Sequence, residues 1–130
     1  MGHVYADFVI RGERAKSIRA IVDTGSTFIV LDPKTISEIG LQKLPYDVEL
    51  TVADKRKVKA GIYFGEVQAK GRKGPVMIAE LDVPSPLVGV NALEALGLKP
   101  NPYSGELEVV GPEGGYLLCI TNAISMVMFS

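Results

Sequence analysis

A short turn with the sequence Asp-Thr-Gly-Ser, at residues 23–26, is the feature that most constrains this chain. Apolar runs at residues 18–22 and 28–31 flank it, so we expect two strands that meet at a turn within the body of a domain. A carboxylate in such a place destabilises the fold unless it is hydrogen-bonded, paired with a charge or protonated. Asp23 is therefore the first candidate for a catalytic residue.

The size and composition of the chain predict a single domain with a packed core. The chain has 130 residues, of which 47% are hydrophobic, which suits one folded domain and argues against disorder. We see no linker, no low-complexity tract and no repeat at a fixed period. We therefore expect one domain over residues 1–130, with a core at about residues 3–98 and a C-terminal extension of strands at about residues 99–130.

Charge and cysteine content limit the expected partners and compartment. The 14 Lys and Arg residues against 15 Asp and Glu residues give a net charge of −1, which predicts no binding to nucleic acid or to a membrane surface. The apolar tail at residues 123–129 is too short to span a bilayer, and charged residues near the N-terminus interrupt any signal pattern. Cys119 is the single cysteine, so an internal disulfide and a cysteine-based zinc site are excluded. We expect a cytoplasmic protein without a metal.

The apolar pattern and the positions of Gly and Pro predict many short strands and two short helices. The strands are expected at residues 3–10, 16–22, 28–31, 48–52, 58–68, 76–81, 107–110 and 116–120. An Asp-Pro pair at residues 32–33 predicts a helix that ends at Gly40, and Asn91 is expected to cap a helix that ends at Gly97. Residues 98–103 contain two prolines and are expected to be irregular. The predicted fold class is mostly β, in a domain closed on itself.

An apolar-apolar-Gly element, Leu87-Val88-Gly89, precedes the second predicted helix. Together with the Asp-Thr-Gly-Ser turn, it resembles the active-site signature of aspartic proteases, in particular the retroviral-type (retropepsin-like) family and its short prokaryotic members. The resemblance covers about residues 4–98. It implies a closed, β-barrel-like acid protease half-fold that forms a two-fold dimer, with Leu87-Val88-Gly89 closing the active-site loop.

The resemblance also implies an aspartic endopeptidase mechanism, which needs two carboxylates that share one proton. One carboxylate takes a proton from the attacking water while the protonated one polarises the scissile carbonyl. The chain has a single Asp-Thr-Gly, so the second carboxylate must be Asp23 of another copy, in a homodimer. The expected substrate is a peptide or an unfolded protein, and no cofactor is needed because water is the nucleophile.

The neighbours of Asp23 take their expected roles from the same family. Thr24 would face across the dimer and bond its counterpart, and Gly25 would leave room beside the carboxylates. Ser26 would donate a hydrogen bond to the aspartate and favour its ionised form. From these roles we expect maximal activity below neutral pH.

The hairpin at residues 48–64 resembles the flap that closes over substrate in this family. Its tip, formed by Ala53, Asp54, Lys55 and Arg56, differs from the glycine-rich retroviral tip. The basic cluster Lys55-Arg56-Lys57 could select acidic peptides or could be only a solvated turn. The returning strand is expected to have one apolar face, formed by Val58, Ala60, Ile62 and Phe64.

One family feature is replaced in this chain. Retroviral enzymes often brace the dimer with an Asp-Arg pair, at the positions where Thr27 or Phe28 and Val90 stand here. The segment beyond Leu98 is a candidate to hold the dimer instead. Its strands could add to the subunit or could pair across the interface.

Three alternatives to a protease compete for the same motif. Asp-Thr-Gly-Ser can be an ordinary turn, because Asp and Gly favour turns for local reasons. It also resembles the phosphate loop of actin-like ATPases, although that fold needs a longer chain and further nucleotide loops, which we do not see. A catalytically silent, protease-like dimer used for peptide binding or assembly is the third.

Overall fold

The computed structural model describes residues 3–52 and 54–112 of the chain. Its first half is a hairpin, a short strand and a helix: β1 (Val4–Arg11), β2 (Ala15–Val22), β3 (Ile29–Leu31) and α1 (Pro33–Ile39). β1 and β2 pair along their whole length, from Val4 opposite Val22 to Arg11 opposite Ala15. Gly40 ends α1 in the left-handed conformation, with φ of 73°, as the sequence predicts.

The second half repeats this order of elements. β5 (Lys57–Ala69), β6 (Arg72–Glu80), β7 (Leu87–Val88) and α2 (Val90–Leu96) are again a hairpin, a short strand and a helix. α2 ends at Gly97, also in the left-handed conformation with φ of 67°. The sequence pattern did not reveal this repeat, because it lies in the order of elements and not in residues at a fixed period.

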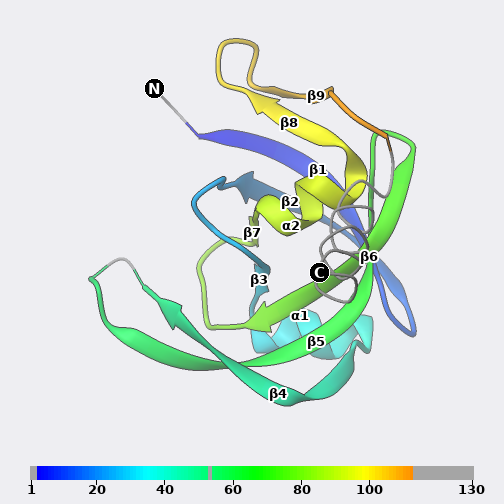
Figure 1. Cartoon of the computed structure of the whole chain (residues 1–130). Helices are drawn as coiled ribbons and strands as arrows, with labels where there is room; N and C mark the ends of the chain where they lie inside the picture. The colour runs from blue at the N-terminus through cyan, green and yellow to red at the C-terminus, as the bar shows by residue number, and fades with distance from the viewer. Residues whose placement is uncertain (1–2, 53, 113–130) are drawn as a thin grey trace, which may run out of the picture.

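One seven-stranded sheet joins the two halves and places the Asp-Thr-Gly-Ser turn. The strand order is β1-β2-β7-β3-β6-β5-β4, and β1 pairs in addition with β5 (Figure 1). β2 runs parallel to β7, with Val22 opposite Val88, and β3 runs parallel to β6. Each half therefore contributes a strand beside the turn that follows β2.

Two groups of buried apolar side chains fill the interior. The larger group packs between the sheet and both helices, and its fully buried members include Phe8, Ile10, Ile29, Leu31, Ile39, Ile78 and Leu96. The smaller group lies at the base of the β4–β5 hairpin and consists of Val30, Ala60, Ile62 and Ala79. The larger group fixes the strands that carry the Asp-Thr-Gly-Ser turn, and the smaller group supports the hairpin above it.

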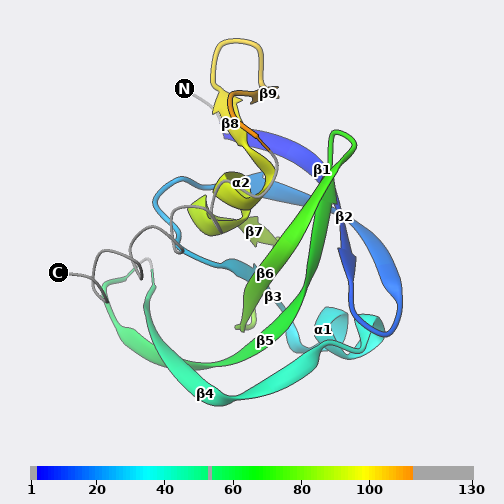
Figure 2. The same ribbon diagram turned by 45° about the vertical axis from the view of Figure 1, so that its right-hand side comes forward.

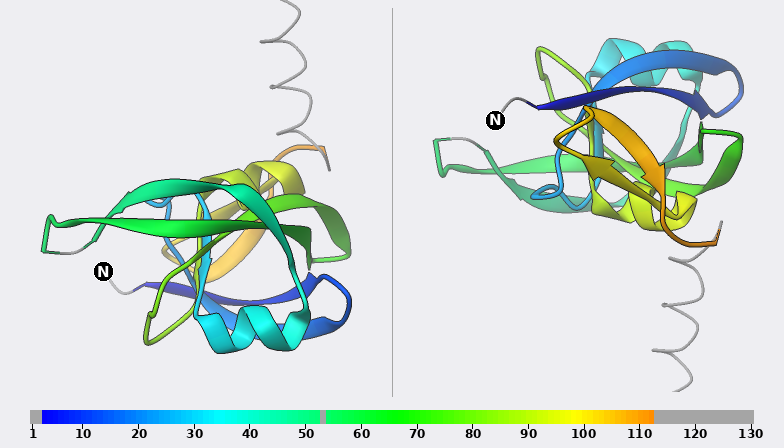
Figure 3. Two further views of the ribbon diagram at one scale, coloured as in Figure 1. Left: turned by 90° about the horizontal axis from the view of Figure 1, so that it is seen from below. Right: turned by 90° about the horizontal axis from the view of Figure 1, so that it is seen from above.

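The strands of the β4–β5 hairpin differ from the prediction in two ways. β4 (Gln42–Thr51) begins six residues earlier than predicted, since a shift in its pairing with β5 extends it beyond the regular alternation. Phe64 was expected on the buried face of β5, but 45% of its surface is exposed. The buried face of β5 changes at Gly65, where an added Cβ atom would lie 2.6 Å from Leu41 Cδ2 and 3.4 Å from Ile78 Cδ1. The hairpin extends well beyond the body of the domain (Figure 3).

Two further predictions are wrong. α2 begins at Val90 after Gly89 as its N-cap, whereas Asn91 was expected to cap it. Residues 98–103 were expected to be irregular, but β8 (Leu98–Asn101) pairs with β9 (Glu106–Val109) in a separate two-stranded sheet (Figure 2). A proline at the edge of a sheet needs no donor, which permits Pro100 in β8. The strand predicted at residues 116–120 lies outside the described residues. Within the described part of the chain, no helix is long and apolar enough to cross a bilayer.

Candidate active site

The Asp-Thr-Gly-Ser turn begins where β2 ends, and the backbone holds it on both sides. The Asp23 N–H donates to the Val88 carbonyl over 3.0 Å, and the Ser26 N–H donates to the Asp23 carbonyl over 3.0 Å. The Gly25 N–H donates to the Asp23 Oδ1 over 2.9 Å. A hydrogen bond to a carboxylate oxygen fixes the direction of that carboxylate. The loop therefore orients the Asp23 carboxylate before any ligand is present.

The start of α2 fixes the other end of the turn. The Val90 N–H donates to the Ser26 carbonyl over 2.8 Å, and the Asn91 N–H donates to the Thr27 carbonyl over 3.1 Å. A Cβ atom on Gly89 would lie 2.4 Å from the Ser26 carbonyl oxygen, so only glycine allows this close approach. The structure thus brings Leu87-Val88-Gly89 against the Asp-Thr-Gly-Ser turn, as the sequence predicts.

The exposure of the turn differs from the expectation. Asp23, Thr24 and Gly25 are all exposed in the single chain, although the apolar runs on either side predict a turn inside the domain. The flanking strands are buried, but the turn between them emerges at the end of the sheet. The Ser26 hydroxyl also differs, since it donates to the Phe28 carbonyl over 3.1 Å and not to Asp23.

The tip of the β4–β5 hairpin is a tight turn with internally paired charges. The Lys55 N–H donates to the Val52 carbonyl over 2.8 Å, and Lys55 has a positive φ of 68°. The Asp54 carboxylate pairs with Arg56 Nε over 2.6 Å, and Glu49 pairs with Lys57 Nζ over 3.6 Å. These two carboxylates offset much of the basic cluster, which favours the solvated-turn interpretation. Ala53, the remaining predicted flap residue, lies outside the described residues.

A pocket of about 560 Å³ lies between the Asp-Thr-Gly-Ser turn and the hairpin. The turn contributes Asp23, Gly25 and Ser26 to its lining, β4 contributes residues 49–51, and Val52 follows directly after β4. The remaining lining is largely apolar, from Phe28, Val30, Leu81, Val83 and Leu87. Apolar pockets with a few polar groups are typical ligand sites. Sequence reasoning missed Phe28, Val30, Leu81 and Val83 as pocket residues, because their apolar pattern indicates only strands and a connector.

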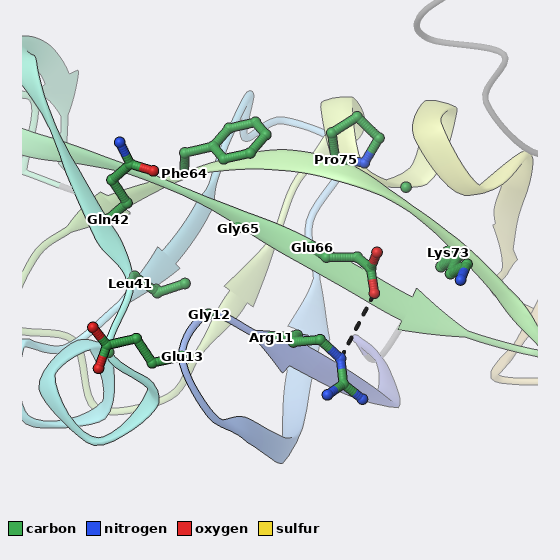
Figure 4. Close-up of a pocket in the computed structure, with 12 residues that line it drawn as sticks. Arg11, Gly12, Glu13, Leu41, Gln42, Phe64, Gly65, Glu66, Lys73 and Pro75 are labelled. Carbon is green, nitrogen blue, oxygen red and sulfur yellow. Dashed lines mark ion pairs between the residues drawn. The ribbon is translucent and has the colours of Figure 1, made fainter.

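A larger pocket, of about 870 Å³, lies elsewhere on the domain (Figure 4). It is lined in part by Leu41, Phe64 and Pro75, and Arg11 Nε pairs there with Glu66 Oε1 over 3.8 Å. None of the lining residues belongs to the Asp-Thr-Gly-Ser turn or to Leu87-Val88-Gly89. The pocket between the Asp-Thr-Gly-Ser turn and the β4–β5 hairpin is therefore the candidate active site. Among the residues that the structure describes, no three His, Cys, Asp or Glu side chains are grouped to hold a metal ion.

Comparison with known families decides what kind of site this is. A family model described as gag-polyprotein putative aspartyl protease matches residues 9–95, which include both Asp23 and Gly89. The chain belongs to this family. A search of curated proteins gives no match.

The fold of this aspartyl protease family member is similar to that of a solved retroviral enzyme. That structure is the EIAV protease complexed with the inhibitor HBY-793, and the TM-score is 0.63. The alignment covers 77% of this chain and 93% of the EIAV chain at 18% sequence identity. At this identity the likeness supports the fold, which is mostly β with two helices, as the sequence predicts.

Proposed function

We propose that this protein is an aspartic endopeptidase that works as a homodimer, with Asp23 of each copy in one shared active site. The observation that carries the proposal is the exposed Asp23 carboxylate, oriented by the Gly25 N–H at the edge of a pocket. The family match supports the same chemistry. The pairing of β1 with β5 supports a half-fold that closes on itself like a barrel.

A single exposed carboxylate does not complete the mechanism, and this is the reason for the dimer. Two carboxylates about 3 Å apart cannot both ionise, so the pair holds one proton between them. The ionised member takes a proton from water, whose oxygen attacks the scissile carbonyl carbon, while the protonated member donates to the carbonyl oxygen. Collapse of the tetrahedral intermediate breaks the C–N bond, and the leaving amine takes a proton from the pair. Asp23 is the sole aspartate followed by Thr-Gly or Ser-Gly, so two copies are needed.

The shape and chemistry of the pocket indicate the substrate. An extended peptide would lie between the β4–β5 hairpin as flap and the turn at residues 23–26, with backbone hydrogen bonds along its length. Phe28, Leu50 and Leu81 are among the apolar residues that line the pocket, so the proposed enzyme prefers apolar side chains near the scissile bond. Since Asp54 and Glu49 pair with the flap cations, a preference for acidic peptides is not expected.

Digestion of a peptide library at several pH values tests the proposal, with Asp23→Asn as the control. We expect cleavage that is inhibited by pepstatin, maximal below neutral pH and lost in Asp23→Asn. Asp23→Asn keeps the size of the side chain and removes the charge, so folding is checked by circular dichroism. Equal cleavage by both proteins, or a rate that is flat or rising from pH 7 to pH 9, would contradict the mechanism. Peptide binding without any cleavage would favour a binding or assembly role.

A further inference from the structure

The β8–β9 hairpin is anchored to the domain on one side and exposed on the other. Leu98 and Leu107 are 4% and 7% exposed and belong to the main core. Val109 and Val110, in contrast, are 57% and 60% exposed. In the described part of the chain the hairpin shares no strand pairing with the seven-stranded sheet. Two-stranded sheets are marginally stable alone, so this exposed face is suited to contact with another surface.

The turn of the β8–β9 hairpin has an ordered backbone and carries an exposed aromatic side chain. The Asn101 Oδ1 accepts hydrogen bonds from the N–H groups of Tyr103 over 2.9 Å and Ser104 over 3.2 Å. The Gly105 N–H donates to the Asn101 carbonyl over 2.8 Å, and the Asn101 Nδ2 donates to Glu108 Oε1 over 2.5 Å. Tyr103 is 93% exposed on this ordered turn. An aromatic residue on a preorganised loop loses little conformational entropy on binding and is a typical interface anchor.

β8 and the turn that follows it lie beside Asp23. A pocket of about 410 Å³ is bounded by Asp23 and Thr24 on one side and by Lys99, Pro100 and Pro102 on the other. The β8–β9 hairpin and the start of β1 lie at one end of the molecule (Figures 1 and 2), and the lining of the pocket places the loop after β2 next to them. A second copy that brings its own Asp23 to this loop would therefore approach the β8–β9 hairpin.

We propose that the β8–β9 hairpin is a dimerisation arm. Tyr103 of each copy packs into the pocket of about 410 Å³ that Asp23 and Thr24 of the other copy line. The inference rests on the proposed homodimer and names the contact that holds it. The contact is isologous, because each copy offers one arm and one pocket to its partner. It also places a residue of one copy directly beside the catalytic loop of the other, so dimerisation and ordering of the active site are coupled.

Tyr103→Ala tests the arm, with Tyr46→Ala as the matched control. Tyr46 is 69% exposed on β4 and does not belong to the β8–β9 hairpin. Both substitutions therefore remove an exposed tyrosine ring. Sedimentation equilibrium should show that Tyr103→Ala weakens the dimer by about thirty-fold, whereas Tyr46→Ala leaves it unchanged. Thermal melting of the monomeric fraction should be equal for both, because neither ring is buried. Unchanged dimerisation of Tyr103→Ala would overturn the arm.

The chain contains no tryptophan, so Tyr103→Trp provides a reporter of the contact. Its emission should shift to the blue as protein concentration rises, while that of Tyr46→Trp should not, because only the former ring becomes buried. A benzoylphenylalanine at position 103 should cross-link isotopically labelled and unlabelled copies, at residues 22–24 or 99–102. Cross-links confined to one copy, or to other surfaces, would overturn the proposal.

The outcomes separate the arm from the proposed activity. An active dimer that is insensitive to Tyr103→Ala overturns the arm and leaves the endopeptidase intact. A Tyr103-dependent dimer that cleaves no peptide supports the arm and overturns the endopeptidase. A wild-type protein that is monomeric at all concentrations overturns both.

Discussion

Replacing Gly89 with alanine would put a methyl group against the backbone of the active-site loop. The new Cβ atom would lie 2.4 Å from the Ser26 carbonyl oxygen and 2.7 Å from the Phe28 carbonyl oxygen. Both neighbours are backbone atoms, so neither can rotate away. The φ of −98° at Gly89 suits any residue, so the entire effect comes from this contact.

The magnitude follows from two contributions. Overpacking of a well-packed site destabilises by about 1–3 kcal/mol. Displacing the loop also strains the hydrogen bond from Val90 N–H to Ser26, whose net contribution is about 0.5–1.5 kcal/mol. We therefore expect Gly89→Ala to lower the free energy of unfolding by about 2–4 kcal/mol, a large part of the roughly 5–15 kcal/mol of a typical domain. A shift of the loop by about 1 Å would also reduce the proposed peptidase activity by about a hundred-fold.

Gly61→Ala is the matched control for this measurement. A Cβ atom on Gly61 would lie 2.7 Å from the Lys43 Nζ, which is the far end of a flexible side chain and can move. Urea denaturation followed by circular dichroism should place Gly61→Ala within about 0.5 kcal/mol of the wild type. If Gly89→Ala were as stable and as active as Gly61→Ala, the close packing of α2 on the active-site loop would be refuted.

Two further predictions concern groups outside the active site. Burial and the neighbouring Glu80 carboxylate, which accepts a hydrogen bond from the phenol, raise the pKa of Tyr63 above its usual value. The folded state thus favours the neutral phenol, so this stabilisation is complete below about pH 10 and is lost as the pH rises through the raised pKa. Above about pH 10, the melting temperature of Tyr63→Phe should fall less than that of the wild type. An equal fall would contradict the assignment. Arg72 Nη1 donates to the carbonyls of Leu96 over 3.0 Å and Gly111 over 2.5 Å. Arg72→Met should therefore lower the free energy of unfolding, measured by urea denaturation, by about 1–3 kcal/mol. An unchanged free energy of unfolding would show that water replaces the side chain.

Local signals explain which parts of the fold the sequence predicts. Gly40 and Gly97 end the two helices because glycine adopts the left-handed conformation without strain. Pro33 starts α1 because its fixed φ suits the first helical position. The contact between the Asp-Thr-Gly-Ser turn and Gly89 also follows from the sequence, through its resemblance to a known family.

The remaining features depend on contacts between distant segments. Asn91 has the sequence signal of a helix cap, but its N–H donates to the Thr27 carbonyl and the cap is Gly89, two residues earlier. Phe64 follows the alternation of β5, yet the packing of Leu41 at Gly65 moves the buried face. Asp23 is flanked by apolar runs but is exposed, because a pattern along one chain does not show at which end of the sheet a turn emerges.

Mixing wild-type protein with Asp23→Asn is the most direct test of a site shared between two copies. With a tenfold excess of Asp23→Asn and full exchange of subunits, about one in eleven wild-type copies would pair with another wild-type copy. Peptidase activity per wild-type copy should then fall by about tenfold. Activity that stays constant over the whole titration would show that one Asp23 is sufficient and would contradict the shared site.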